Sequence, residues 1–149
     1  VSVGIVSALI GGRAIWTVPG MFVLMMGVGG MAGWSGLAIP STVVELAIAL
    51  SVVLLGGVIL LNQKLPVPLA MAAVAFFGFF HGFAHGAEIP DVASPMEYAP
   101  GFMLGTILLN LLGVLIGDIA QRYERGVTVL RIAGGVFMVL GMLFILGVL

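Results

Sequence analysis

Cysteine is absent from the 149 residues, and charged side chains make up only 7% of them. Without cysteine the chain can form no disulfide, no thiolate metal site and no iron–sulfur cluster. Soluble domains carry about 25% charged residues, so this chain lacks the side chains needed to cover a water-facing surface. Its five basic residues form no patch, which excludes nucleic acid as a partner.

Hydrophobic residues take the place of charge, at 62% of the sequence and with a mean hydropathy of +1.32. Five apolar stretches are each close to the ~20 residues that a helix needs to cross a bilayer. We predict them at Trp16–Ala38, Val43–Leu61, Pro68–Gly86, Ala99–Ala120 and Val127–Leu149. The expected fold is all-α: a polytopic transmembrane helix bundle, one domain over residues 1–149, surrounded by the lipid bilayer. Short links between the stretches predict antiparallel neighbours.

The first residues, Val1–Ile10, are apolar but too few to span a membrane. Ten helical residues reach about 15 Å, half of the ~30 Å hydrocarbon core. They precede Gly11, Gly12 and Arg13, and there is no initiator methionine. We therefore expect five complete spans plus a partial N-terminal helix, with six helices in the full protein.

The basic residues predict an orientation in the membrane. Arg13, Lys64 and Arg122 fall in connections on one side of the predicted bundle, together with Arg125 and Arg131. By the positive-inside rule this side faces the cytoplasm. Residues 87–98 and the C-terminus then face outward.

Glycine is abundant, with 23 residues, and three of them recur every fourth position at Gly78, Gly82 and Gly86. Such a stripe of small residues lets a second helix approach closely. We interpret it as a packing face, and we interpret the other spaced glycines in the same way: Gly27, Gly30, Gly33, Gly101, Gly105, Gly113, Gly117, Gly134 and Gly141.

Two histidines and a glutamate stand at the outer end of the third predicted span, at positions 81, 85 and 88. The spacing i, i+4, i+7 places His81, His85 and Glu88 on one face of a helix. Ionisable groups inside a membrane indicate function by default, and imidazole with carboxylate suits nickel, cobalt, zinc or iron(II). The alternatives are histidines that bond to neighbouring helices and a solvated Glu88. Three ligands from one helix cannot surround an ion, so other helices would have to complete the site.

Four further polar residues could line a path to this site. Asp91 and Glu97 could form a negative vestibule that attracts cations, or they could belong to an ordinary acidic loop. Glu45 could lie on the metal pathway. Alternatively, its charge could stabilise the dipole at the start of a helix that Ser41 or Thr42 caps. Asn110 lies mid-span, where a hydrogen bond between helices is the alternative. The spacing of Asp118 and Arg122 predicts a structural ion pair.

The string from Phe80 to Pro90, FHGFAHGAEIP, resembles the second histidine motif of the HupE/UreJ family, small bacterial membrane proteins associated with nickel or cobalt uptake. The resemblance continues in residues 11–14, 48–52 and 98–110. It implies about six helices, with His81, His85 and Glu88 as metal ligands and with Gly82, Gly86 and Pro90 as framework. The family's first motif, of the form H-P-x-x-G-x-D-H, is absent and would be expected before Val1.

These observations predict a secondary permease rather than an enzyme. Its substrate would be a divalent metal, nickel or else cobalt, carried across the bacterial inner membrane without an organic cofactor. One alternative is a non-transporting accessory subunit of a larger membrane complex. The other is a metal-dependent intramembrane hydrolase with zinc at the site. Besides lipid, the partners would be further copies of the chain or a larger membrane complex.

Overall fold

The computed structural model describes residues 1–89 and 95–148, and this part of the chain contains six α-helices and no strand. Five of the helices are long and apolar enough to cross a membrane, which confirms the prediction of an all-α membrane bundle. The helices are α1 (Ser2–Ile10), α2 (Ala14–Trp34), α3 (Ser41–Leu60), α4 (Val67–Ala87), α5 (Pro95–Gln121) and α6 (Glu124–Ile145).

Three helix boundaries lie four residues from the predicted position: α2 ends at Trp34 rather than Ala38, and the other two are the start of α5 and the end of α6. Helix α5 begins at Pro95 rather than Ala99, so Glu97 lies in its first turn and not in a loop. Proline fits the first helical position and an acid there is favourable to the helix dipole, which explains the earlier start. Helix α6 ends at Ile145, four residues before the predicted end, and Gly147 follows with a φ of 69°.

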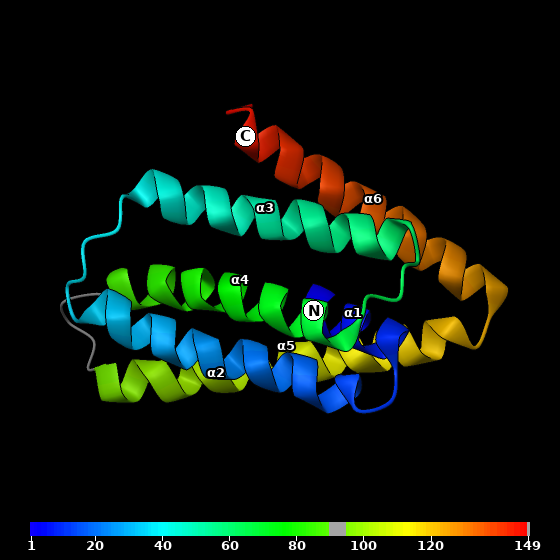
Figure 1. Cartoon of the computed structure of the whole chain (residues 1–149), viewed down its shortest axis with the longest axis horizontal. Helices are drawn as coiled ribbons and strands as arrows, with labels where there is room; N and C mark the ends of the chain where they lie inside the picture. Colours follow the sequence, from blue (N-terminus) through cyan, green and yellow to red (C-terminus); the bar gives the residue numbers. More distant parts are fainter. Residues whose placement is uncertain (90–94, 149) are drawn as a thin grey trace.

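Neighbours in the sequence are not the closest neighbours in space. The closest pairs are α2 with α4, α3 with α6, and α1 with α5, while the consecutive helices α3 and α4 touch far less (Figure 1). Residue numbers rise together along α2–α4 and along α1–α5, so these pairs are parallel. Helices joined by short links run antiparallel, as expected (Figure 1). The closest packing nevertheless joins helices that are not consecutive, because it follows the helix faces that carry glycine.

Helices α2 and α4 approach each other through glycine on both sides. A Cβ added to Gly82 would overlap the backbone of Met26, and one added to Gly86 would overlap the backbone of Gly30. From the other side, Gly29 of α2 meets the backbone of Phe79. Glycine is required here because the two backbones leave no space for a side chain.

The spaced glycines of α5 divide into two groups. Gly113 meets the backbone of Val1, and Gly117 meets Ile5 and Ala8. A Cβ on Gly101 or Gly105, in contrast, would meet nothing within 4 Å among the described residues. The expectation that the latter pair packs against a helix was therefore wrong for this part of the chain.

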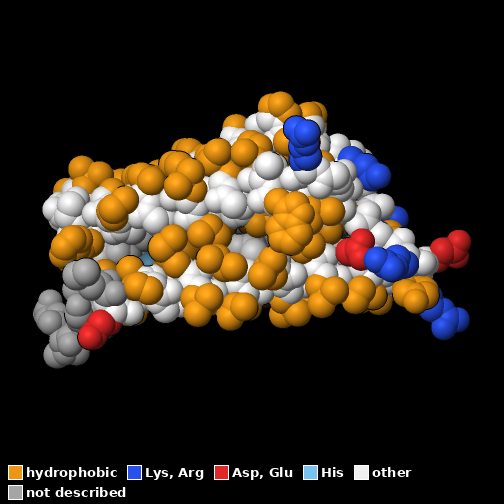
Figure 2. All heavy atoms as spheres, turned by 90° about the horizontal axis from the view of Figure 1, so that it is seen from below, with side chains coloured by type: hydrophobic (Ala, Val, Ile, Leu, Met, Phe, Trp, Pro, Cys, Tyr) orange, Lys and Arg blue, Asp and Glu red, His pale blue; other side chains and the backbone are white. Residues whose placement is uncertain are grey.

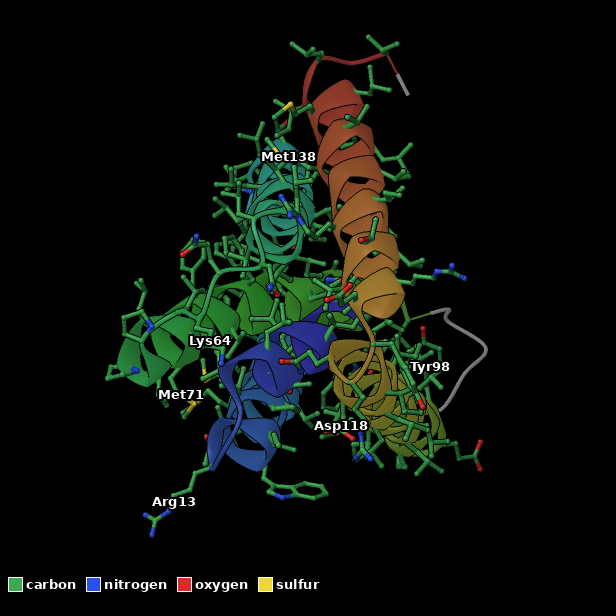
Figure 3. All side chains as sticks on the ribbon, turned by 90° about the vertical axis from the view of Figure 1, so that its right-hand side faces the viewer. Arg13, Lys64, Met71, Tyr98, Asp118 and Met138 are labelled. Carbon is green, nitrogen blue, oxygen red and sulfur yellow. The ribbon has the colours of Figure 1, made fainter. Side chains whose placement is uncertain are left out.

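The short helix α1 is the most enclosed element. All residues from Val3 to Leu9 are buried, although the helix is only nine residues long. Seen along the bundle, α1 lies between α2 and α5 with α3 and α6 to one side (Figure 3). It ends at Gly11 and Gly12, whose φ angles of 80° and 57° let the chain reverse into α2.

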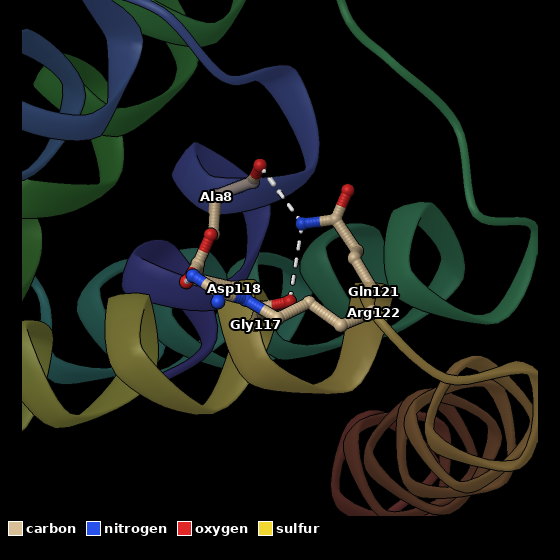
Figure 4. A network of polar contacts seen from close by, with 5 residues as sticks. All are labelled: Ala8, Gly117, Asp118, Gln121 and Arg122. Carbon is tan, nitrogen blue, oxygen red and sulfur yellow. Dashed lines mark hydrogen bonds and ion pairs between the residues drawn. The ribbon is translucent and has the colours of Figure 1, made fainter.

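At the end of the bundle that carries the basic residues, two helices have a C-terminal carbonyl that accepts a hydrogen bond from a side chain of another helix. Gln121 Nε2 donates to the Ala8 carbonyl of α1 at 3.0 Å and to Gly117 O at 3.1 Å (Figure 4). Arg131 Nε donates to the Leu60 carbonyl of α3 at 2.9 Å. These bonds satisfy acceptors that a helix C-terminus leaves free.

A Gln121→Leu variant is expected to lose about 0.5–1.5 kcal/mol in the free energy of unfolding, because the Ala8 carbonyl would keep no partner. Unfolding in detergent micelles, titrated with a denaturing detergent, measures this loss. Asp118→Asn is the matched control: the predicted Asp118–Arg122 pair is confirmed, at 2.6 Å, but it is exposed, so its loss should cost at most about 0.5 kcal/mol. Equal losses in the two variants would contradict the capping role.

The outer surface is apolar along most of its length and charged at the ends. In Figure 2 hydrophobic side chains cover the sides of the bundle, while Lys and Arg side chains gather at one end. Leucines on three different helices are about half exposed: Leu24, Leu54 and Leu108. This surface suits a lipid environment, because the backbone N–H and C=O groups are hydrogen-bonded within the helices.

Candidate metal site

Helix α4 holds the two histidines one turn apart. Their ring centroids are 5.5 Å apart, as expected for i and i+4 on one helix face. Both imidazoles are partly buried. The glycines at positions 78, 82 and 86 let α2 pack directly against α4 beside them, so the close helix contact places α2 next to the histidine face.

Aromatic rings from two other helices contact the histidines. Phe22 of α2 lies 5.9 Å from His81, centroid to centroid, and Phe102 of α5 lies 4.0 Å from His85. Tyr98 stacks on Phe102 at 6.3 Å with an interplanar angle of 4°. A row of five rings thus connects α5 and α2 through the two histidines.

A cavity of about 590 Å³ opens beside His85, between α2, α4 and α5. Its wall is almost wholly apolar, and His85 is the only ionisable side chain of the α4 wall. In Figure 2 histidine atoms are visible in a hollow at the end opposite the basic side chains. The cavity is far larger than a metal ion, so it could admit an ion that still carries water. The lining residues outside α4 include Met26, Met31, Trp34, Ile89, Tyr98, Phe102 and Met103.

The third predicted ligand, Glu88, stands just beyond the end of α4. It is the C-cap residue, its backbone N–H donates to Ala84 O at 3.1 Å, and its side chain is exposed. Within residues 1–89 and 95–148, no three His, Asp or Glu side chains lie close enough together to hold a metal ion. The structure therefore brings His81 and His85 together, while the three-residue site remains a prediction.

The predicted vestibule residues are spread over separate elements. Glu97 is exposed in the first turn of α5, and Asp91 lies outside the described residues. Glu45 is exposed on α3, whose N-cap is Pro40. No side chain caps α3, so the expectation that Ser41 or Thr42 does so was wrong: the helix already begins at Ser41.

Asn110 is the most deeply buried polar side chain of α5, with 3% of its surface exposed. Its backbone carbonyl lies against Gly4 of α1. Its Oδ1 has no hydrogen-bond partner among the described residues, so the interhelical bond expected for that oxygen is not made. A buried, free acceptor in the middle of a bundle is costly unless water or an ion reaches it.

Sequence reasoning missed Phe102 and Phe22. Each contacts a histidine only because its helix crosses the histidine face of α4. Phenylalanine is common in this chain, with nine residues, and nothing in the spacing distinguishes these two. Only the helix pairing identifies them.

The two ends of the bundle differ in charge. Arg13 follows α1, Lys64 lies between α3 and α4, and Arg122 lies between α5 and α6, so all three share one end; Figure 3 shows Arg13 projecting away from it. Glu88 and Glu97 lie at the other end, next to the histidines. This distribution attracts cations to the histidine end.

Comparison with known proteins gives one family. The family model described as HupE / UreJ protein matches residues 1–144. Protein HupE of Rhizobium leguminosarum bv. viciae is 38% identical over 148 residues, which are 99% of this chain and 75% of that protein. No solved structure matches the chain.

Proposed function

The chain belongs to the HupE/UreJ family, and on this premise we propose that it is a secondary permease for a divalent transition metal. We propose nickel as the substrate, with cobalt as the alternative, because the family is associated with the uptake of these metals. The family is one of metal transporters and not of enzymes, so the hydrolase alternative is dropped.

The observation that carries the proposal is the position of His81 and His85. Two imidazoles face the same way on a membrane-spanning helix, and one of them lines a cavity between three helices. Polar groups are expensive to hold in such a place unless they bind something. Neutral imidazole is a suitable ligand for Ni²⁺ and Co²⁺.

The proposed path begins at the acidic end of the bundle. Glu97, with Asp91 in the preceding connection, would concentrate cations at the entrance. The ion would then bind His81, His85 and Glu88, with further ligands from other helices. Asn110 supports an inward path, since its buried Oδ1 is free to accept a bond from a water on the ion.

We propose that the basic end lies in the cytoplasm of a bacterial inner membrane and the histidine end outside it. The positions of Arg13, Lys64 and Arg122 support this orientation. The sequence contains no phosphate-binding loop, so the driving force would be the metal gradient itself or a coupled proton.

Metal uptake tests the proposal. The test uses cells that lack their own nickel transporters and express the full-length protein. With His85→Ala, uptake of labelled nickel is expected to be at least about tenfold slower than with the unchanged protein, since even the loss of a residue that only orients a metal ligand costs about 10–100-fold in affinity or activity. Phe76→Ala is the matched control, because it removes a ring that is 53% exposed on the same helix. Unchanged uptake by the His85→Ala cells would refute the site and leave the accessory-subunit alternative.

A further inference from the structure

Among the aromatic ring pairs that involve a histidine, His85 and Phe102 have the shortest centroid distance. Their ring centroids lie 4.0 Å apart with an interplanar angle of 44°. Carbon atoms in van der Waals contact are about 3.5–4.0 Å apart, so no water fits between the two rings. In this conformation Phe102 covers one side of the imidazole that faces α5.

Phe102 contacts His85 although the backbones of α4 and α5 are not closely packed. Helix α5 packs mainly against α1, α2 and α6 and has little backbone contact with α4. Both Phe102 and His85 line the cavity of about 590 Å³. A phenyl ring that borders a cavity can change rotamer without moving its helix.

We propose that Phe102 is a gate on the histidine site. The ring covers the side of His85 that faces α5 in the conformation seen here, and it must turn into the cavity before an ion or its water can bind the imidazole from that side. Tyr98, stacked on Phe102 one turn earlier, supports the ring in its closed position. The role of a gate rests on the proposed function, because a gate needs an ion to admit. Whether Phe102 covers His85 can be tested without any metal.

The test is the rate at which diethyl pyrocarbonate modifies each histidine of the full-length protein in detergent, followed by mass spectrometry. Phe102→Ala is expected to raise the rate at His85 about tenfold, the gain that results when an open state populated about one tenth of the time becomes permanent. His81, whose ring contacts Phe22, should keep its rate. Phe102→Tyr restores a ring and should return His85 to the slow rate.

One control variant and one substitute for the alanine variant keep the result specific. Leu104→Ala removes a side chain that is 56% exposed on the same helix, and it should leave both rates unchanged. Phe102→Leu opens the site with a smaller loss of volume, and it serves if the alanine variant does not fold. An unchanged rate at His85 in Phe102→Ala and Phe102→Leu, or an equal rise at His81 or in Leu104→Ala, would overturn the gate.

Adding Ni²⁺ separates the gate from the permease site. Slower modification of both histidines in the presence of Ni²⁺ supports the metal site whatever Phe102 does. A faster rate in Phe102→Ala without any protection by Ni²⁺ would support the gate and refute the metal site. Protection by Ni²⁺ with no effect of Phe102→Ala would refute the gate alone.

Discussion

Replacing Gly82 with alanine is expected to lower the free energy of unfolding by about 3 kcal/mol, the upper part of the range for overpacked interiors. The added methyl group would overlap the carbonyl oxygen, carbonyl carbon and Cα of Met26. All three are backbone atoms, so no side chain can move aside and α2 must shift away from α4. Denaturing-detergent titration of the purified protein measures the loss.

The same substitution at Gly105 provides the control. A Cβ there meets nothing within 4 Å in the described part of the chain. Alanine favours a helix over glycine by up to about 1 kcal/mol, so Gly105→Ala should be neutral or stabilising. Similar losses at Gly82 and Gly105 would show that helix propensity, and not the α2–α4 contact, decides the effect.

The His81→Ala/His85→Ala double variant is expected to bind nickel at least about a hundredfold more weakly, since even the loss of a residue that only orients a ligand costs about 10–100-fold in affinity. Elemental analysis of the purified full-length protein after equilibration with nickel measures the bound metal. Near one ion per unchanged chain and almost none per double variant is the expected result. Glu88→Gln should fall between them if the carboxylate is a ligand.

Other outcomes of the metal analysis are equally informative. Equal nickel content in the unchanged protein and the double variant would place the binding site elsewhere. Zinc retained in preference to nickel and cobalt would contradict the proposed substrate. Glu45→Gln is a useful comparison with Glu88→Gln, because both acids are exposed at the histidine end but Glu45 lies on α3.

The number and approximate bounds of the spans could be predicted because bilayer thickness fixes them. Helix α3 was expected at Val43–Leu61 and lies at Ser41–Leu60. Pairing could not be predicted in the same way, since many helix faces carry glycine and only geometry selects among them. Gly29, which was overlooked, meets the backbone of Phe79, whereas the expected contact at Gly105 is absent from the described residues.

The candidate site could be predicted only where it depends on spacing within one helix. Helical spacing alone places His81 beside His85, and the centroid distance of 5.5 Å agrees with it. The ring of Phe102 comes from a different helix, and no spacing rule connects residues 85 and 102. Glu88 stands where the helix ends, so its side-chain direction depends on the chain that follows and not on helical periodicity.

The pairing of α3 with α6 has a consequence for the order in which the protein is made. Gly56 of α3 lies against the backbone of Gly134 and Met138 in α6, yet α4 and α5 leave the ribosome between them. During synthesis α3 therefore stays in the membrane without its main partner until α6 is inserted. A nascent chain that stops after α5 presents an unfilled backbone groove to lipid, and membrane quality-control proteases are the factors that would meet it.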